Sequence, residues 1–250
     1  MTMFSRLAPY YDDLFPLNQK ALQFFKTEVE KRGTQSALDV ACGTGQYTLA
    51  FASWGLYAAG IDIDRRMIAE ARKKQQQNNI SNASFVAGDM RNLNRHFSPT
   101  GSVFCIGNSL AALTSAEDVQ KTLHEMNEIL LPGGFIVIQL VNFDRYLTEG
   151  TLLFPVIERE DPPLRLERKY APTDNGLILF TTHLSLFDPQ NNRKPKKYID
   201  RTKLIPIDSD TMTTWLKEAG FSEIQLHGDF DRSPWTTDSP AAVYQAVKSL

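Results

Sequence analysis

Three aspartates each lie at or near the end of an apolar run, and a short glycine loop follows the first of them. Asp39 belongs to ALDVACGTG, where the loop glycines are Gly43 and Gly45, and GIDID and AGDM contain Asp62 and Asp89. Glycines let the backbone approach a ligand closely, and a helix that begins after such a loop offers unpaired N–H groups and a positive dipole. This pattern is typical of a site for an adenine-containing cofactor.

The residue types around the loop discriminate between cofactors. A dinucleotide site usually needs G-x-G-x-x-G to make room for a pyrophosphate, whereas Thr48 stands at the third glycine position. The Asp39 carboxylate would repel a pyrophosphate but attract the ammonium of an amino acid, and S-adenosyl-L-methionine carries an ammonium and a sulfonium. Asp62 can accept hydrogen bonds from both ribose hydroxyls, and Asp89 from the adenine amino group. We therefore predict S-adenosyl-L-methionine as the cofactor.

The elements that must position these residues alternate between strand and helix in the first half of the chain. The apolar runs predict strands over residues 37–41, 56–62, 84–87, 103–106 and 135–141. Helical patterns separate them over residues 47–53, 65–77 and 115–130. Such alternation predicts an α/β fold with a doubly wound, mostly parallel sheet, and the apolar run FIVIQLV fits burial on both faces.

The pattern changes after about residue 142. Three strand-like segments with short connections, which should pair antiparallel, cover residues 164–170, 177–187 and 196–207. A helix over residues 209–219 and two strands over residues 221–227 and 242–247 follow. We therefore predict one α/β core, residues 1–145 and 208–250, interrupted by an antiparallel β insertion, residues 146–207, that forms a lid over the substrate.

Composition narrows the class of protein. The 250 residues are 42% hydrophobic and 22% charged with a formal net charge of -2, which is ordinary for a globular protein and predicts no general attraction to nucleic acid or anionic lipid. No apolar run approaches the roughly 18 residues of a membrane span, and MTMFSRLAPYYDD lacks the apolar core of a signal peptide. Cys42 and Cys105 lack metal-type spacing, so we expect a reduced, cytoplasmic protein without a metal site. A homo-oligomer is compatible with this composition.

Several motifs together resemble a known family. LDVACGTG, GIDID, AGDM, FCIGNSL and LLPGGFIVI occur in the order and spacing of class I S-adenosylmethionine-dependent methyltransferases, over roughly residues 35–145. The resemblance implies a seven-stranded sheet whose last strand pair is antiparallel. Ala41 stands where the family often has glycine. On this resemblance the cofactor contacts are expected from Tyr11, Asp39, Ala41, Gly43, Gly45, Asp62, Ile63, Asp89, Met90 and Ile106.

Two further segments narrow the resemblance. GNSLAAL and GDFDRSPWTTDSP are similar to small-molecule N-methyltransferases, including glycine N-methyltransferase-like and sugar-amine enzymes. Those enzymes carry an antiparallel insertion after the fifth strand and an N-terminal Tyr-Asp motif, which Tyr11 and Asp12 match here. In the glycine-type enzymes a histidine follows the Asn-Ser pair, whereas Ala112 occupies that position. This difference disfavours glycine itself as the methyl acceptor.

The implied reaction is an in-line displacement at a sulfonium methyl, in which the protein mainly supplies position and orientation. Our catalytic candidates are His183, Tyr11 and Asn108. If the insertion covers the cofactor cleft, the strand face that carries His183 could present a base to the substrate; a solvent-exposed strand face is the alternative. Tyr11 offers a ring face to the sulfonium cation. Asn108, at the carboxyl edge of the sheet, either contacts the substrate amine or only holds its loop.

Other functions remain open at this point. Transfer to oxygen usually needs a base or a metal. A nucleic-acid methyltransferase is disfavoured because GNSL replaces the Asn/Asp-Pro-Pro-aromatic motif of adenine-amino enzymes, and Cys105 lacks the Pro-Cys setting of cytosine-carbon enzymes. A nicotinamide dehydrogenase is disfavoured by Thr48 and Asp39. A catalytically silent module that binds S-adenosylmethionine is the non-enzyme alternative. We predict methyl transfer to a small-molecule acceptor, on nitrogen in preference to oxygen.

Overall fold

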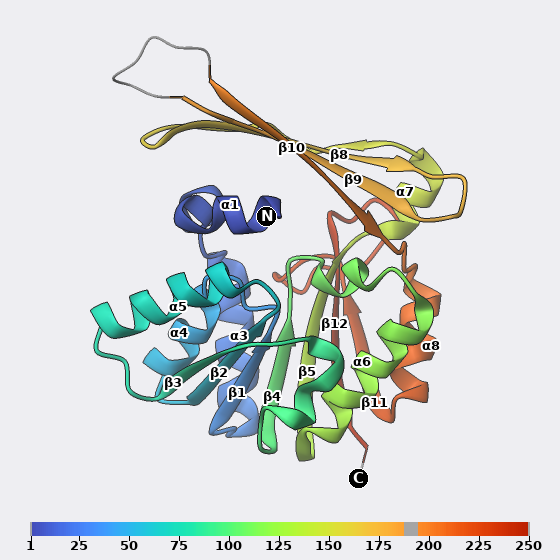
Figure 1. The fold of residues 1–250 in the computed structure, drawn as a ribbon. Coiled ribbons are helices and arrows are strands. Elements are labelled where there is room, and N and C mark those ends of the chain that lie inside the picture. Colours follow the sequence, from blue (N-terminus) through green and yellow to red (C-terminus); the bar gives the residue numbers. More distant parts are fainter. Residues whose placement is uncertain (1, 188–194, 250) are drawn as a thin grey trace.

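A seven-stranded sheet forms the core of the chain, which a computed structural model describes over residues 2–187 and 195–249 (Figure 1). Its strand order is β11-β12-β5-β4-β1-β2-β3. The strands are β1 (Ser36–Val40), β2 (Tyr57–Asp62), β3 (Ala83–Ala87), β4 (Thr100–Cys105), β5 (Leu130–Val141), β11 (Phe221–His227) and β12 (Ala241–Lys248). β1 to β5 pair in parallel, and β12 runs antiparallel between β5 and β11. The predicted fold class is confirmed.

Helices cover both faces of this sheet, because its strands are apolar on both sides. Phe104 of β4 packs on one side with α3 (Gln19–Arg32), α4 (Gln46–Ser53) and α5 (Arg65–Gln77). Its neighbours Val103 and Cys105 point to the opposite side, where the core includes α6 (Ala116–Glu128) and α8 (Ser209–Glu218). Alternate side chains of a strand face opposite ways, so a single strand anchors both helical layers.

The insertion forms a second, antiparallel sheet beyond the carboxyl ends of the parallel strands (Figure 1). α7 (Phe143–Glu149) leads from β5 into it. Its strands are β6 (Leu152–Leu153), β7 (Ile157–Glu160), β8 (Pro163–Pro172), β9 (Ile178–Leu186) and β10 (Lys196–Leu204). Leu164, Leu166 and Tyr170 of β8 are buried and face the rest of the molecule. We call this layer the insertion sheet.

Three short helical turns lie between the insertion sheet and the core: α1 (Met3–Leu7), η1 (Ala8–Tyr10) and α2 (Tyr11–Leu14) (Figure 1). Met3, Leu7 and Leu14 are buried against leucines of β8 and β9. The Met3 amide donates to Asp200 of β10 at 2.9 Å, and the Ser5 hydroxyl donates to Asp64 at the start of α5. The N-terminal segment, as we call residues 2–15, therefore connects the two layers.

Several strands differ from their predicted bounds. β4 begins at Thr100 and β10 ends at Leu204, each three residues earlier than predicted, and β5 differs most. β5 begins at Leu130, five residues before the predicted start at residue 135, and includes the sequence Leu131-Pro132-Gly133-Gly134. Leu130 pairs with Thr100, and an irregularity follows before Ser102 pairs with Phe135. The Pro-Gly-Gly stretch therefore bends the strand instead of separating it from α6. Among the described residues, no helix is both long and apolar enough to cross a membrane.

The conformation of Gly45 generates a prediction for stability. Gly45 has φ +77°, and a Cβ there would lie 2.5 Å from the Phe85 ring and 2.9 Å from Ala71 Cβ. We expect Gly45→Ala to lower the free energy of unfolding by roughly 2–4 kcal/mol, from backbone strain and overpacking together. Gly176 has the same φ with nothing within 4 Å, so Gly176→Ala should cost only about 1 kcal/mol. Equal losses in urea titrations would contradict this steric explanation.

Candidate active site

Asp39 lies inside β1 and is only 2% exposed. Its carboxylate accepts a hydrogen bond from the Thr48 hydroxyl at 2.7 Å. Burial raises the pKa of Asp39 to about 7, although the Thr48 hydrogen bond acts in the opposite direction. Thr48, which occupies the third glycine position of the dinucleotide motif, therefore serves here as the partner of the buried acid.

Asp62 ends β2 and holds the glycine loop in place. One carboxylate oxygen accepts from the Gly43 amide at 2.9 Å, and the other accepts from the Asp64 amide at 2.8 Å. Burial raises the pKa of Asp62. The loop itself needs left-handed backbone conformations at Ala41, Gly43 and Gly45. Since each carboxylate oxygen has a second lone pair, Asp62 retains capacity to accept hydroxyl donors from a ligand.

Tyr11 lies over this loop. Its ring is in contact distance of Gly43, where an added Cβ would lie 3.5 Å from Tyr11 Cε1. Burial, with Asp62 next in importance, raises the pKa of the Tyr11 phenol well above its usual range. The neighbouring Asp12 accepts from the Thr44 hydroxyl and from the Lys74 ammonium. The Tyr-Asp pair recognised in the sequence is thus located at the loop.

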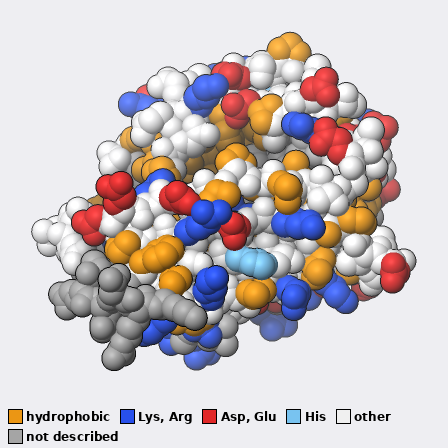
Figure 2. Space-filling model, turned by 90° about the horizontal axis from the view of Figure 1, so that it is seen from above, with side chains coloured by type: hydrophobic (Ala, Val, Ile, Leu, Met, Phe, Trp, Pro, Cys, Tyr) orange, Lys and Arg blue, Asp and Glu red, His pale blue; other side chains and the backbone are white. Residues whose placement is uncertain are grey.

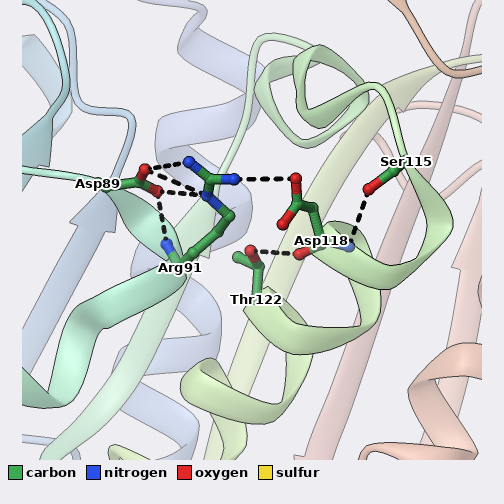
Figure 3. A network of polar contacts seen from close by, with 5 residues as sticks. All are labelled: Asp89, Arg91, Ser115, Asp118 and Thr122. Atoms are coloured by element: carbon green, nitrogen blue, oxygen red, sulfur yellow. Dashed lines mark hydrogen bonds and ion pairs between the residues drawn. The ribbon is translucent and has the colours of Figure 1, made fainter.

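Asp89 is held by an arginine that sequence reasoning missed (Figure 3). Arg91 Nη2 donates to one Asp89 oxygen at 2.6 Å, and Nε donates to the other at 3.0 Å. The same guanidinium reaches Asp118 of α6 through Nη1 at 2.9 Å. These bonds hold the pKa of Asp89 below its usual value. The sequence could have indicated the Asp89–Arg91 pair, because the two residues are only two positions apart. It gave no signal for Asp118, which is 27 residues after Arg91.

Asn108 has both ends of its side chain engaged by the protein. Its Nδ2 donates to the Tyr170 hydroxyl at 3.0 Å, and its Oδ1 accepts from the Val141 amide at 3.0 Å. Asn108 also adopts a left-handed conformation, with φ +64°. The geometry therefore favours the loop-holding alternative, and it adds a direct link to β8 that the sequence did not indicate.

His183 lies apart from the other predicted site residues, on the outer face of the insertion sheet. It is exposed on β9, and its cross-strand partners are Glu167 and Ile199. Its neighbours Thr182 and Leu184 are the residues that point inward and are buried. The outer face of the insertion sheet, seen from above, carries basic side chains among acidic and apolar ones (Figure 2). Of the two interpretations of the sequence, a base that faces the substrate or a solvent-exposed strand face, the position of His183 favours the second.

The remaining predicted contacts lie around the same sheet edge. Ile63, directly after Asp62, is an apolar side chain left 74% exposed. Met90 begins η2 (Met90–Arg95) and is partly buried against the core. Ile106 follows β4 and is partly buried on the opposite side of the sheet. Among the described residues, no group of three or more His, Cys, Asp or Glu side chains is arranged to hold a metal ion.

Aromatic side chains of the insertion form a cluster that the sequence reading also missed. Tyr170 has ring centroids of Phe154 at 4.8 Å and Phe180 at 5.1 Å. Tyr146 of α7 lies 6.1 Å from the same ring. Burial raises the pKa of Tyr170 to about 12. Alternation along β8 and β9 was the available signal, because residues of one parity share a face.

Comparison with known proteins agrees with this architecture. Residues 37–134 match the family model of a methyltransferase domain. The chain is 26% identical over 227 residues to a glycine/sarcosine N-methyltransferase of Aphanothece halophytica, covering 90% of this chain and 81% of that protein. It is 32% identical over 156 residues to the dTDP-3-amino-3,4,6-trideoxy-alpha-D-glucopyranose N,N-dimethyltransferase of Streptomyces venezuelae, covering 62% of each. The fold matches a solved S-adenosylmethionine-dependent methyltransferase from Clostridium acetobutylicum with a TM-score of 0.83, at 15% identity and 99% coverage of both chains.

The sheet order, the loop after β1 and the matched domain define a class I methyltransferase fold. Residues 37–134 therefore carry a methyltransferase domain, in a fold shared with solved S-adenosylmethionine-dependent methyltransferases. Its relatives include small-molecule N-methyltransferases. The predicted fold and the predicted enzyme class, a methyltransferase, are confirmed.

The raised pKa of Asp39 generates a prediction for cofactor binding. If the Asp39 carboxylate receives the cofactor's ammonium, the Asp39 carboxyl must lose its proton on binding. The affinity for the cofactor should therefore rise with pH until the pKa of about 7 is passed. We expect the Kd for S-adenosylmethionine to weaken roughly tenfold or more from about pH 7.5 to about pH 5.5. In Asp39→Asn, calorimetry should show weaker binding with this dependence removed. A pH dependence that survives in the variant would contradict the assignment.

The raised pKa of Asp39 also predicts how the free energy of unfolding depends on pH when no cofactor is bound: it should fall as pH rises. A carboxyl whose folded pKa lies above its unfolded value binds a proton more tightly when folded, so its contribution falls as pH rises from about 4 to about 7. Asp39→Asn should therefore show less loss of unfolding free energy over this range than the native chain. This comparison serves as the control that the variant folds.

Proposed function

We propose that this methyltransferase acts on an amine nitrogen of a small molecule. The observation that carries the proposal is that no histidine lies beside Tyr11 or Asp39, the residues assigned to the methionine end of the cofactor. All four histidines lie in the described residues. His124 and His183 are exposed, and the exposed His96 lies beside Gly88, next to Asp89 on the adenine side. His227 packs against Phe24. A neutral amine already carries the lone pair for attack, so it needs no base before methyl transfer.

The phenols at the site support nitrogen over oxygen. Burial raises the pKa of Tyr11 beyond its usual range and that of Tyr170 to about 12. Both therefore remain protonated near neutral pH and do not activate an alcohol. Their rings and hydroxyls instead provide orientation, and a tyrosine face suits a cation.

The cofactor fits the residues around the loop. S-adenosylmethionine supplies an activated methyl on its sulfonium. We assign the methionine ammonium to Asp39, the ribose hydroxyls to Asp62 and the adenine amino group to Asp89, with Tyr11 over the methionine end. Ile63 and Met90 provide apolar surface beside the adenine acid. The amine lone pair forms the new N–C bond while the C–S pair leaves on sulfur, and the product ammonium then releases a proton.

A small acceptor is consistent with how the carboxyl edge of the core sheet is covered. The insertion sheet and the N-terminal segment pack on each other and lie beyond the carboxyl ends of the core strands (Figure 1), as a cover over a small acceptor would. Cys42 and Cys105 are both free, in keeping with the expected cytoplasmic location.

Labelled-methyl transfer to a panel of primary and secondary amines, matched with alcohols and phenols of the same skeleton, tests this proposal. We expect transfer to at least one amine class and none to its oxygen counterpart. Transfer to oxygen only would replace the proposal by an O-methyltransferase. Tight cofactor binding with no transfer to any acceptor would favour the silent binding module.

The position of His183 generates a second prediction. Because His183 faces outward on β9, His183→Ala should leave kcat/KM for the amine within about twofold of the native value, well below the roughly 10²-fold loss expected for a general base. A loss of that size, with unchanged cofactor affinity, would restore His183 as the base and require the insertion sheet to rearrange.

A further inference from the structure

Two arginines on β8 point to opposite sides of the insertion sheet and differ in their partners. Arg165, on the outer face, pairs with Glu158 and Glu167, each at 2.7 Å. Arg168 is on the inner face, and within the described part of the chain it has no ion-pair partner. Its Nη2 reaches only the Pro155 carbonyl at 3.4 Å, and its buried Nε has no acceptor.

The surroundings of Arg168 hold its guanidinium in one place. The group lies 5.4 Å from the ring of Phe15 and 5.2 Å from that of Phe154. Phe15 belongs to the N-terminal segment and lies 5.0 Å from Tyr11. Tyr170, two residues further along the same face of β8, accepts from Asn108. Arg168 is therefore located between the tyrosine over the cofactor loop and the loop that follows β4.

A half-buried cation with no counter-charge is costly unless a ligand supplies one. Burial lowers the pKa of Arg168, and only the Tyr170 and Tyr11 phenols act against that trend. Stacking on two aromatic rings compensates partly but leaves the hydrogen-bonding edge of the guanidinium unused. That edge has the fork geometry that matches an anion with two oxygens.

We infer that Arg168 binds a carboxylate of the methyl acceptor, so that the substrate is an amine that also carries one carboxylate. The inference rests on the proposed function. A single guanidinium offers one bidentate edge and one charge, which a carboxylate matches. A phosphate would call for further cations, and Lys74, whose partner Asp12 also bonds the loop residue Thr44, is already paired. Through Tyr170, the face that carries Arg168 is also hydrogen-bonded to Asn108 after β4, so the carboxylate site adjoins the loop after β4 as well as Tyr11.

The experiment compares matched acceptors in native enzyme, Arg168→Gln, Arg168→Lys and the control Arg165→Gln. Glycine, sarcosine and phenylalanine are each set against their amides and decarboxylated amines, and aminomethylphosphonate serves as the phosphate-like probe. Calorimetry with S-adenosylhomocysteine present measures binding, and labelled transfer measures KM and kcat. We expect the carboxylate probes to be preferred by the native enzyme.

Arg168→Gln should raise the acceptor KM by roughly 10- to 100-fold, the loss expected for charge-assisted hydrogen bonds, with a smaller change in kcat. Preference for acid over amide should disappear with it. Arg168→Lys should recover part of the affinity, because it keeps the charge but not the fork. Arg165→Gln should leave all constants unchanged, and the Kd of S-adenosylmethionine should be unchanged in every variant that remains folded.

Several results would overturn the inference. These are equal use of amides and acids by the native enzyme, preference for the phosphonate, binding of none of the carboxylate probes, or an unchanged KM in Arg168→Gln. A weakened Kd for S-adenosylmethionine in folded Arg168→Gln would assign the arginine to the cofactor's carboxylate instead. Binding that depends on Arg168 without any methyl transfer would support the inference as a binding site and count against the proposed function alone. Transfer to amines regardless of their carboxylates would do the reverse.

Discussion

The buried carboxylate of Asp39 constrains most of what surrounds it. A carboxylate in the middle of a parallel sheet needs a donor, and Thr48 of α4 supplies one. For that hydroxyl to arrive, α4 must begin directly after the loop, which requires left-handed backbone at Gly45. The neighbouring strand must also have no side chain at Gly60, where a Cβ would lie 2.8 Å from Thr48 Oγ1 and from the Cys42 sulfur. Loop, helix and strand therefore meet around one acid.

The second constraint is the parity of β8 and β9. β8 and β9 each present one set of side chains to solvent and the other to the layer beneath, so moving the register by one residue would exchange them. Arg168 and Tyr170 are inside, and Arg165 and His183 are outside, for this reason alone. The chemistry available to a substrate is thus decided by alternation along two strands as much as by the choice of residue types.

Much of the core followed from the sequence because its signals are local. Apolar runs, a helix start at Ser115 and acids at strand ends predicted the elements and the cofactor, while the seven strands and the antiparallel last pair came from the family resemblance. The helices of the N-terminal segment were not predicted, since turns of four or five residues are stable only through tertiary contacts. Alternation along residues 177–187 showed that His183 shares a face with every second residue, but not which layer that face meets. Asp118, the distant partner of Arg91, had no local signal.

The contact between Met3 and Asp200 spans 197 residues of the chain. During synthesis, which proceeds from the amino end, the parallel strands β1 to β5 are complete long before β10 exists. The N-terminal segment therefore has to wait, with Leu7 and Leu14 exposed, until nearly the whole chain has left the ribosome. Contacts of such high sequence separation form slowly. A nascent chain would thus hold an open cofactor edge first and acquire its cover last.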